Sequence, residues 1–155
     1  MKPRILANAS LLGLVLVLAV FLCGCRSDAD SDGFSAFKVR GKSYTGRPAR
    51  IELRDGRVVL EVGASDVRLA AQSAETFGSL QDAVGKTLNA DSVGTVSLPA
   101  GDYPLLRIQG GSLTLQSVSG GRAQGNYNLK VVGQTSDGAE GAALEVIGSF
   151  DALID

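Results

Sequence analysis

Apolar and polar residues alternate along most of the chain from Phe34 onward. A period of two is typical of a β-strand with one buried and one solvated face, because successive side chains point to opposite faces. The longest alternation ends the chain, where every second position is occupied by Leu144, Val146, Gly148, Phe150, Ala152 and Ile154. Strand and helix patterns do not alternate in the βαβ manner, so the sequence predicts antiparallel pairing.

The dipeptide Asp55-Gly56 predicts a type I′ hairpin turn. A two-residue loop fixes the pairing of the flanking strands, and it separates apolar from charged residues on two faces. The expected opposite pairs are Leu53 with Val58, Ile51 with Leu60, and Arg50 with Glu61. The outer face then holds Arg50, Glu52, Arg54, Arg57, Val59 and Glu61.

The dipeptide Gly110-Gly111 is interpreted in the same way, as a second hairpin turn. Ile108 would then lie opposite Leu113, and Leu106 opposite Leu115. Other strands are expected at residues 34–39, 42–45, 95–98 and 127–131, and Gly148 is expected to mark a bulge or bend in the last strand.

One helix is expected, beginning at Ser79 with Asp82 three residues later and ending near Asn89. Leu80, Ala83, Val84 and Leu88 would form its apolar side. About nine or ten strands and one short helix predict a mainly β fold, an antiparallel β-sandwich or small barrel.

Composition excludes several kinds of chemistry. The 155 residues contain no histidine, so Ser-His-Asp catalysis, His-ligated zinc and proximal-His haem are excluded. A formal charge of −1 gives no reason to expect a nucleic-acid partner. We expect no cofactor and no metal, and we do not expect an enzyme.

The first residues have the pattern of an export signal. Lys2 and Arg4 precede an uncharged stretch from Ile5 to Gly24. The stretch ends in Leu22-Cys23-Gly24-Cys25, which resembles the lipobox of bacterial lipoprotein precursors. In that family a peptidase cuts before the cysteine, whose sulfur carries a diacylglycerol. The resemblance therefore implies lipidation of Cys25, with membrane attachment through its acyl chains.

The resemblance implies a division into a signal peptide at residues 1–24, a lipidated tether at 25–33 and a β-rich domain at 34–155. Arg26 stands where Asp commonly signals inner-membrane retention, so the lipoprotein would lie in the outer membrane, facing the periplasm. In a single-membrane bacterium it would lie on the outer face of that membrane. The alternatives are an uncleaved transmembrane helix over residues 5–24 and a cleaved signal without lipidation.

Two motifs with possible ligands fail on spacing. Asp28, Asp30 and Asp32 match the opening of an EF-hand loop, but Val39 stands where the loop needs glutamate. The triplet Gly85-Lys86-Thr87 resembles the end of a phosphate-binding loop, but the required earlier glycine is missing. We therefore expect residues 28–32 to be an acidic tether and not a calcium site, and Gly85-Lys86-Thr87 to be part of a helix surface and not a nucleotide site.

Three weaker candidates remain on the surface. Asp102, Asp137 and Glu140 would be the carboxylates of a glycosidase, and Asn126, Tyr127 and Asn128 beside Tyr103 a sugar-binding patch. Residues 38–68 contain eight basic and four acidic residues, which would allow contact with an anionic surface. A solvated surface is the competing interpretation of each.

The function expected from the sequence is a non-catalytic binding or structural domain held to the membrane by lipid. Its partner would be an envelope protein or polymer. The alternatives are a carrier of a small apolar ligand and a carbohydrate-active enzyme.

Overall fold

A computed structural model describes residues 32–64, 67–97, 105–134 and 140–155, which lie within one compact unit, Ser31–Asp155. The signal segment, Cys25, Asp28, Asp30, Pro99–Asp102, Tyr103 and Asp137 fall outside the described residues. The elements are β1 Phe34–Val39, β2 Lys42–Gly46, β3 Ala49–Arg54, β4 Arg57–Ala64, β5 Val67–Thr76, the 3-10 helix η2 Leu80–Ala83, β6 Thr87–Asn89, β7 Thr95–Ser97, β8 Leu105–Ser119, β9 Arg122–Gln134 and β10 Glu140–Ile154.

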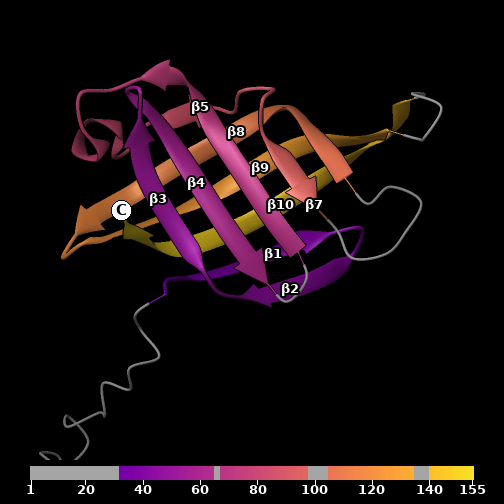
Figure 1. Cartoon of the computed structure of the whole chain (residues 1–155), viewed down its shortest axis with the longest axis horizontal. Coiled ribbons are helices and arrows are strands. Elements are labelled where there is room, and N and C mark those ends of the chain that lie inside the picture. The colour runs from indigo at the N-terminus through magenta and orange to yellow at the C-terminus, as the bar shows by residue number, and fades with distance from the viewer. Residues whose placement is uncertain (1–31, 65–66, 98–104, 135–139) are drawn as a thin grey trace, which may run out of the picture. The chain divides into compact units, whose positions relative to one another are not determined.

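The ten strands form one sheet in which seven strands close a ring. Going around, β3 pairs with β4, β5 follows, then β7, β8, β9 and β10, and β10 returns to β3 through the one parallel pairing of the described sheet. The β1–β2 hairpin attaches to β10, and β6 attaches to β8. Figure 1 shows β3, β4 and β5 crossing in front of β8, β9 and β10. The predicted mainly β fold, sandwich or small barrel, is confirmed.

The interior between these layers is filled with apolar side chains that form a single cluster. The largest fully buried ones include Ile51, Leu60, Leu69, Leu88, Leu106, Ile108, Leu113, Leu115 and Leu129. They come from strands all around the ring, so burial of this cluster links the two layers. Burial of apolar surface at about 25 cal/mol per Å² is the main force holding such a ring closed.

The Asp55-Gly56 hairpin has the predicted register. Leu53 pairs with Val58, Ile51 with Leu60, and Arg50 with Glu61. The two turn residues have φ of 51° and 78°, as a type I′ turn requires. The predicted strands at residues 34–39 and 42–45 are present as β1 and β2, and the described part of the one predicted at 95–98 is present as β7.

The predicted hairpin at Gly110-Gly111 is wrong. Both glycines lie inside the 15-residue strand β8, where the register against β9 shifts between Ile108 and Gly110. One extra residue moves the inward positions from even to odd numbers, so Leu106, Ile108, Leu113 and Leu115 all face the core. A bulge thus produces the parity change that the sequence attributed to a turn. The turn itself is Gly120-Gly121, between β8 and β9.

The predicted helix is much shorter than expected. Ser79 does cap it, because its hydroxyl accepts a hydrogen bond from the Asp82 N–H, but η2 ends at Ala83. Gly85 then has φ of 76°, and Leu88 lies buried in strand β6. Pairing of β6 with β8 replaces the last helical turns, since it buries Leu88 and bonds the backbone at once.

The last strand alternates to its end as predicted, with Val146, Phe150 and Ala152 buried. Gly148 is not a bulge, because its pairing with β1 and β9 is continuous and the register shift of β10 lies between Glu140 and Ala143. A Cβ atom on Gly148 would lie 2.5 Å from Tyr127 Cζ and 2.7 Å from Phe37 Cβ. Glycine is needed here because two aromatic residues pack against its backbone.

Candidate functional site

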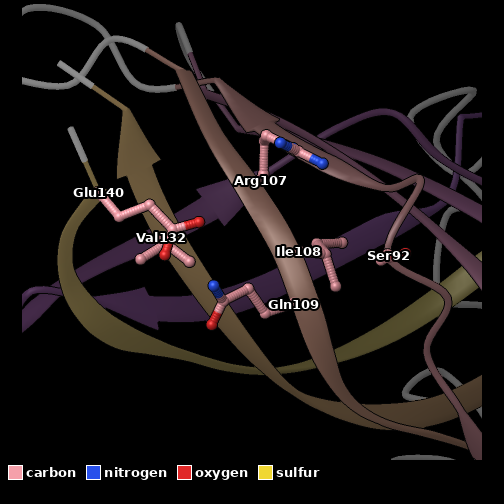
Figure 2. Close-up of a pocket in the computed structure, with 6 residues that line it drawn as sticks. All are labelled: Ser92, Arg107, Ile108, Gln109, Val132 and Glu140. Atoms are coloured by element: carbon pink, nitrogen blue, oxygen red, sulfur yellow. The ribbon is translucent and has the colours of Figure 1, made fainter. Parts of the chain in front are cut away.

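The phosphate-loop and sugar-patch candidates do not assemble into sites in the described residues, whereas the carboxylate candidate stays a prediction, because Glu140 is the one member of its three residues that is described. Glu140 lines a pocket of about 310 Å³ together with Arg107, and Figure 2 shows the Arg107 side chain extending away from Glu140. Lys86 Nζ lies 5.2 Å above the centre of the Phe77 ring, a cation–π contact, and Gly85 and Thr87 do not open a helix. Tyr127 faces the core while Asn126 and Asn128 face outward, so the predicted sugar patch is split between two faces.

The basic segment contributes to a mixed-charge surface, which we call the charged face: the outward residues Arg50, Glu52, Arg54, Arg57, Glu61 and Arg68 of β3, β4 and β5. Arg50 Nη1 lies 3.3 Å from Asp155 Oδ1, and Arg57 Nη1 lies 2.5 Å from Asp91 Oδ2. Arg54 pairs with Glu52. The three hairpin arginines therefore meet carboxylates of this chain.

The opposite layer carries a surface of a different kind, which we call the polar face. It consists of two rows of outward residues, each running across β6, β8, β9, β10, β1 and β2. The first row is Thr87, Thr114, Asn126, Ser149, Ala36 and Thr45, and the second is Asn89, Ser112, Asn128, Ile147, Lys38 and Ser43. Nine of these twelve residues are Ser, Thr or Asn, and Lys38 alone carries a charge.

Each row is continuous because every neighbour along it is a directly paired residue. Strands lie 4.7–4.9 Å apart, so a row across six strands is about 24 Å long. The two rows are about 7 Å apart, since they are two residues apart along each strand. The polar face thus offers an array of hydroxyl and amide groups at regular spacing.

The centre of the polar face is a hollow of about 430 Å³. The residues that line it are all uncharged: Ala36, Ser112, Thr114, Asn126, Tyr127, Asn128, Ile147, Gly148 and Ser149. Small side chains and the bare backbone of Gly148 keep the surface low between the taller side chains of Asn126, Asn128 and Ile147. A ligand lying across the strands would contact β8, β9, β10 and β1 at once.

The polar groups in the hollow are not used by the protein itself. Within the described residues, the side chains of Asn126, Asn128, Ser112, Thr114 and Ser149 make no hydrogen bond or ion pair. At the margins the situation changes: Asn89 Nδ2 donates to Glu75 Oε1 at 2.5 Å, and Arg122 Nε donates to Asp151 Oδ1 at 2.8 Å. The central hydroxyls and amides therefore face solvent and are available to bond a ligand.

The alternate residues beneath the rows form the floor of the hollow. Across the same six strands the inward residues are Leu88, Leu113, Tyr127, Gly148, Phe37 and Tyr44, paired one to the next. The Tyr127 ring stacks on Phe150, with centroids 6.4 Å apart, and Phe37 stacks on Tyr44 at 5.5 Å. Packed aromatic residues below the sheet hold the outward residues at fixed positions.

Two buried hydroxyls lie in this floor. Tyr127 is 2% exposed and Ser35 is fully buried, and neither hydroxyl has a well-formed hydrogen bond within the described chain. Burial raises the pKa of Tyr127 well above its usual range, and the neighbouring Ser35 hydroxyl offsets this only in part. Tyr127 is therefore neutral at physiological pH, and the floor carries no charge.

The sequence does contain a signal for the polar face, although it was not used in our prediction. Four strands contribute a tripeptide of the form polar–apolar–polar: Ser43-Tyr44-Thr45, Thr87-Leu88-Asn89, Ser112-Leu113-Thr114 and Asn126-Tyr127-Asn128. Each is an ordinary amphipathic strand fragment on its own. Only the pairing of the strands aligns the four tripeptides in the same two rows, three of them on adjacent strands and the fourth on β2, beyond β10 and β1.

No protein-family model matches this chain, and no curated protein matches it in sequence. The described residues contain no helix long and apolar enough to cross a membrane. The same residues contain no cluster of three or more His, Cys, Asp or Glu side chains.

Proposed function

We propose that this protein is a lipid-anchored envelope protein whose β domain binds a neutral, hydroxyl-rich polymer on the polar face. The observation that carries the proposal is the register of the two rows, which aligns hydroxyl and amide groups of β6, β8, β9, β10 and β2, and those in the central hollow make no hydrogen bond within the described residues. Such groups exchange hydrogen bonds with the hydroxyls of a polysaccharide at each step along it.

The shape of the site favours an extended ligand. A row of about 24 Å is longer than a single sugar and is continuous from β6 to β2. Because only Lys38 among the twelve residues is charged, the polar face offers little to a polyanion. A neutral polymer lying across the strands matches both properties.

The membrane anchor is the second part of the proposal. Cys25, at the end of the lipobox-like run from Leu22, would carry the lipid, and residues 25–33 would tether the domain. Several acyl chains, at about 0.8 kcal/mol per buried CH₂, hold such a domain firmly to a membrane. We place it on the periplasmic side of an outer membrane, or on the outer face of a single membrane.

The carrier alternative requires an empty interior. In the described residues the space inside the ring is occupied by the leucine-rich cluster that includes Leu60, Leu113 and Leu129. The arrangement of polar groups therefore favours binding on the outer surface over transport of an apolar molecule inside.

The polymer is tested by sedimentation of the full chain, in detergent micelles, with insoluble neutral polysaccharides. The double variant Asn126→Ala with Thr114→Ala removes two side chains that lie opposite each other in the first row. It should weaken binding about tenfold, since each hydrogen bond contributes about 0.5–1.5 kcal/mol. Gln72→Ala, on the outward side of β5, is the control and should bind as the wild type does. Absence of binding to every neutral polymer would contradict the proposal.

The anchor is tested by metabolic labelling with a fatty-acid probe. The wild type should be labelled and the Cys25→Ser variant should not. Cys23→Ser serves as the matched control and should retain the label, because Leu22 rather than a small residue precedes Cys23. Label that persists in Cys25→Ser would contradict the anchor without affecting the polymer site.

A further inference from the structure

We propose that the polymer taken by the polar face is built of N-acetylated amino sugars, and that its acetamido group binds at Asn128 and Ile147. This proposal rests on the proposed function of the polar face and names the class of its ligand. The observation behind it is an exposed apolar residue, Ile147, among the polar residues of the two rows.

Ile147 is the exception within the two rows. It is the one large apolar residue among the twelve, it is 51% exposed, and it lines the central hollow. Its neighbours across the strands are Asn128 on β9 and Lys38 on β1. A ligand resting in the hollow therefore contacts an aliphatic side chain flanked by polar groups.

Asn128 supplies the complementary polar contact. It lies directly opposite Ile147 in an antiparallel pair, which places their Cβ atoms about 5 Å apart. Its carboxamide has two donors and one acceptor, and none of them is used within the described chain. The Asn128 amide is therefore free to donate to the carbonyl oxygen of a secondary amide on the ligand.

An acetamido group combines a carbonyl oxygen, an N–H and a methyl group in one unit. Its carbonyl oxygen accepts from the Asn128 amide and its methyl group covers Ile147, while its N–H, which points away from its carbonyl in a trans amide, is left to donate to a hydroxyl of the rows. The remaining hydroxyls of the sugar face the Ser and Thr side chains of neighbouring strands, such as Ser112 and Ser149. The acetamido group has no net charge, which agrees with the uncharged lining of the hollow.

Other ligands use this pair of residues less completely. A plain glucan matches the hydroxyl rows but sets a sugar hydroxyl against Ile147 and desolvates it without a partner. A polyanion finds Lys38 alone within the rows. A peptide strand pairs with the edge of a sheet and does not lie across its face.

The experiment compares two β-1,4-linked tetramers that differ only at the 2-position of each sugar: N-acetylglucosamine tetramer and glucose tetramer. Binding to the full chain in detergent micelles is measured by calorimetry. We expect the N-acetylated tetramer to bind at least about tenfold more tightly, the value of one buried methyl group and one added hydrogen bond. Equal affinities for the two tetramers would overturn the acetamido site.

Variants locate the effect. Ile147→Ser and Asn128→Ala should each weaken binding of the N-acetylated tetramer, and Ile147→Ser should leave the glucose tetramer unchanged. Ile147→Thr keeps the β-branched shape and should show the same selective loss. Leu105→Ser on β8 is the matched control, because Leu105 is also 51% exposed but lies outside the rows. An equal loss in Leu105→Ser would overturn the assignment to Ile147.

The outcomes separate this inference from the proposed function. If both tetramers bind equally and the Asn126 and Thr114 variant weakens both, the polymer site holds and the acetamido preference is wrong. If neither tetramer nor any neutral polymer binds, the proposed function is wrong as well.

Discussion

On the charged face of β3, β4 and β5, arginines meet carboxylates of the same chain, whereas at the centre of the polar face, within the described residues, hydroxyls and amides meet none. Arg57 pairs with Asp91 at 2.5 Å and Arg50 with Asp155 at 3.3 Å. Asn126 and Asn128, one layer away, have no side-chain partner in the described residues. Both faces are solvated, but only the polar face keeps its hydrogen-bonding groups available for a ligand.

The difference shows how to judge a surface. Counting charges favours the charged face as a site, since residues 38–68 are strongly basic. Ion pairs within the chain reduce the electric field of the charged face. Each exposed pair contributes only about 0–1 kcal/mol to stability. The polar face has almost no charge, yet its groups are aligned by strand pairing and supported by packed aromatic residues.

The floor of the polar face gives the largest expected effect. Gly148→Val should lower the free energy of unfolding by about 2–4 kcal/mol, because its Cβ would overlap Tyr127 and Phe37. Urea unfolding measures the change. Ser149→Val, one residue along and facing outward, is the control and should change stability by less than about 0.5 kcal/mol. Equal costs would mean that the floor is not tightly packed.

Substitutions in the turn of each layer, between β3 and β4 and between β8 and β9, have the next largest expected effect. Gly56 on the charged side has φ of 78° and Gly121 on the polar side has φ of 76°. Replacing either with valine should cost about 1–3 kcal/mol, since a β-branched residue is strained at positive φ. Urea midpoints measure both variants against the matched alanine variants, which should be milder. A cost at Gly56 with none at Gly121 would contradict the β8–β9 turn.

A smaller effect separates the two faces directly. A double-mutant cycle of Arg57→Gln and Asp91→Asn should show a coupling of about 0.5–1 kcal/mol that falls at high salt. The equivalent cycle on the polar face, Ser112→Ala with Asn128→Ala, should show coupling below about 0.3 kcal/mol, because the two side chains do not bond each other. Strong coupling on the polar face would mean that its groups are already paired.

The smallest expected effect lies at the margin of the polar face. Burial opposes ionisation of Glu75, but hydrogen bonds from the Asn89 side chain and backbone outweigh it and lower the pKa of Glu75 below its ordinary 4.5. The stabilisation is therefore present above pH 4.5 and is lost as pH falls below it. Glu75→Gln should be slightly less stable than wild type at pH 7, and the difference should shrink as pH falls below 4.5. Glu145→Gln, an exposed glutamate, is the control in thermal unfolding.

The sequence predicted the mainly β class, the hairpin at Asp55-Gly56 and several strands. It was misleading at Gly110-Gly111 because a bulge and a turn both reverse the parity of the apolar positions, and local sequence does not distinguish them. It was misleading at Leu88 because apolar spacing after a good helix cap suits a helix, while pairing with β8 places the residue in a strand. Long-range pairing decided both cases.

The candidate site was predicted only in fragments. Asn126, Tyr127 and Asn128 were recognised as a possible sugar patch, but period two places the tyrosine on the opposite face from the two asparagines. The sequence by itself determined which residues of each strand face outward, because alternation is a local property of the chain. Tertiary structure alone decided that the outward Ser, Thr and Asn residues of five strands share two rows, because strand order and register depend on pairings between residues as far apart as Ala36 and Ser149.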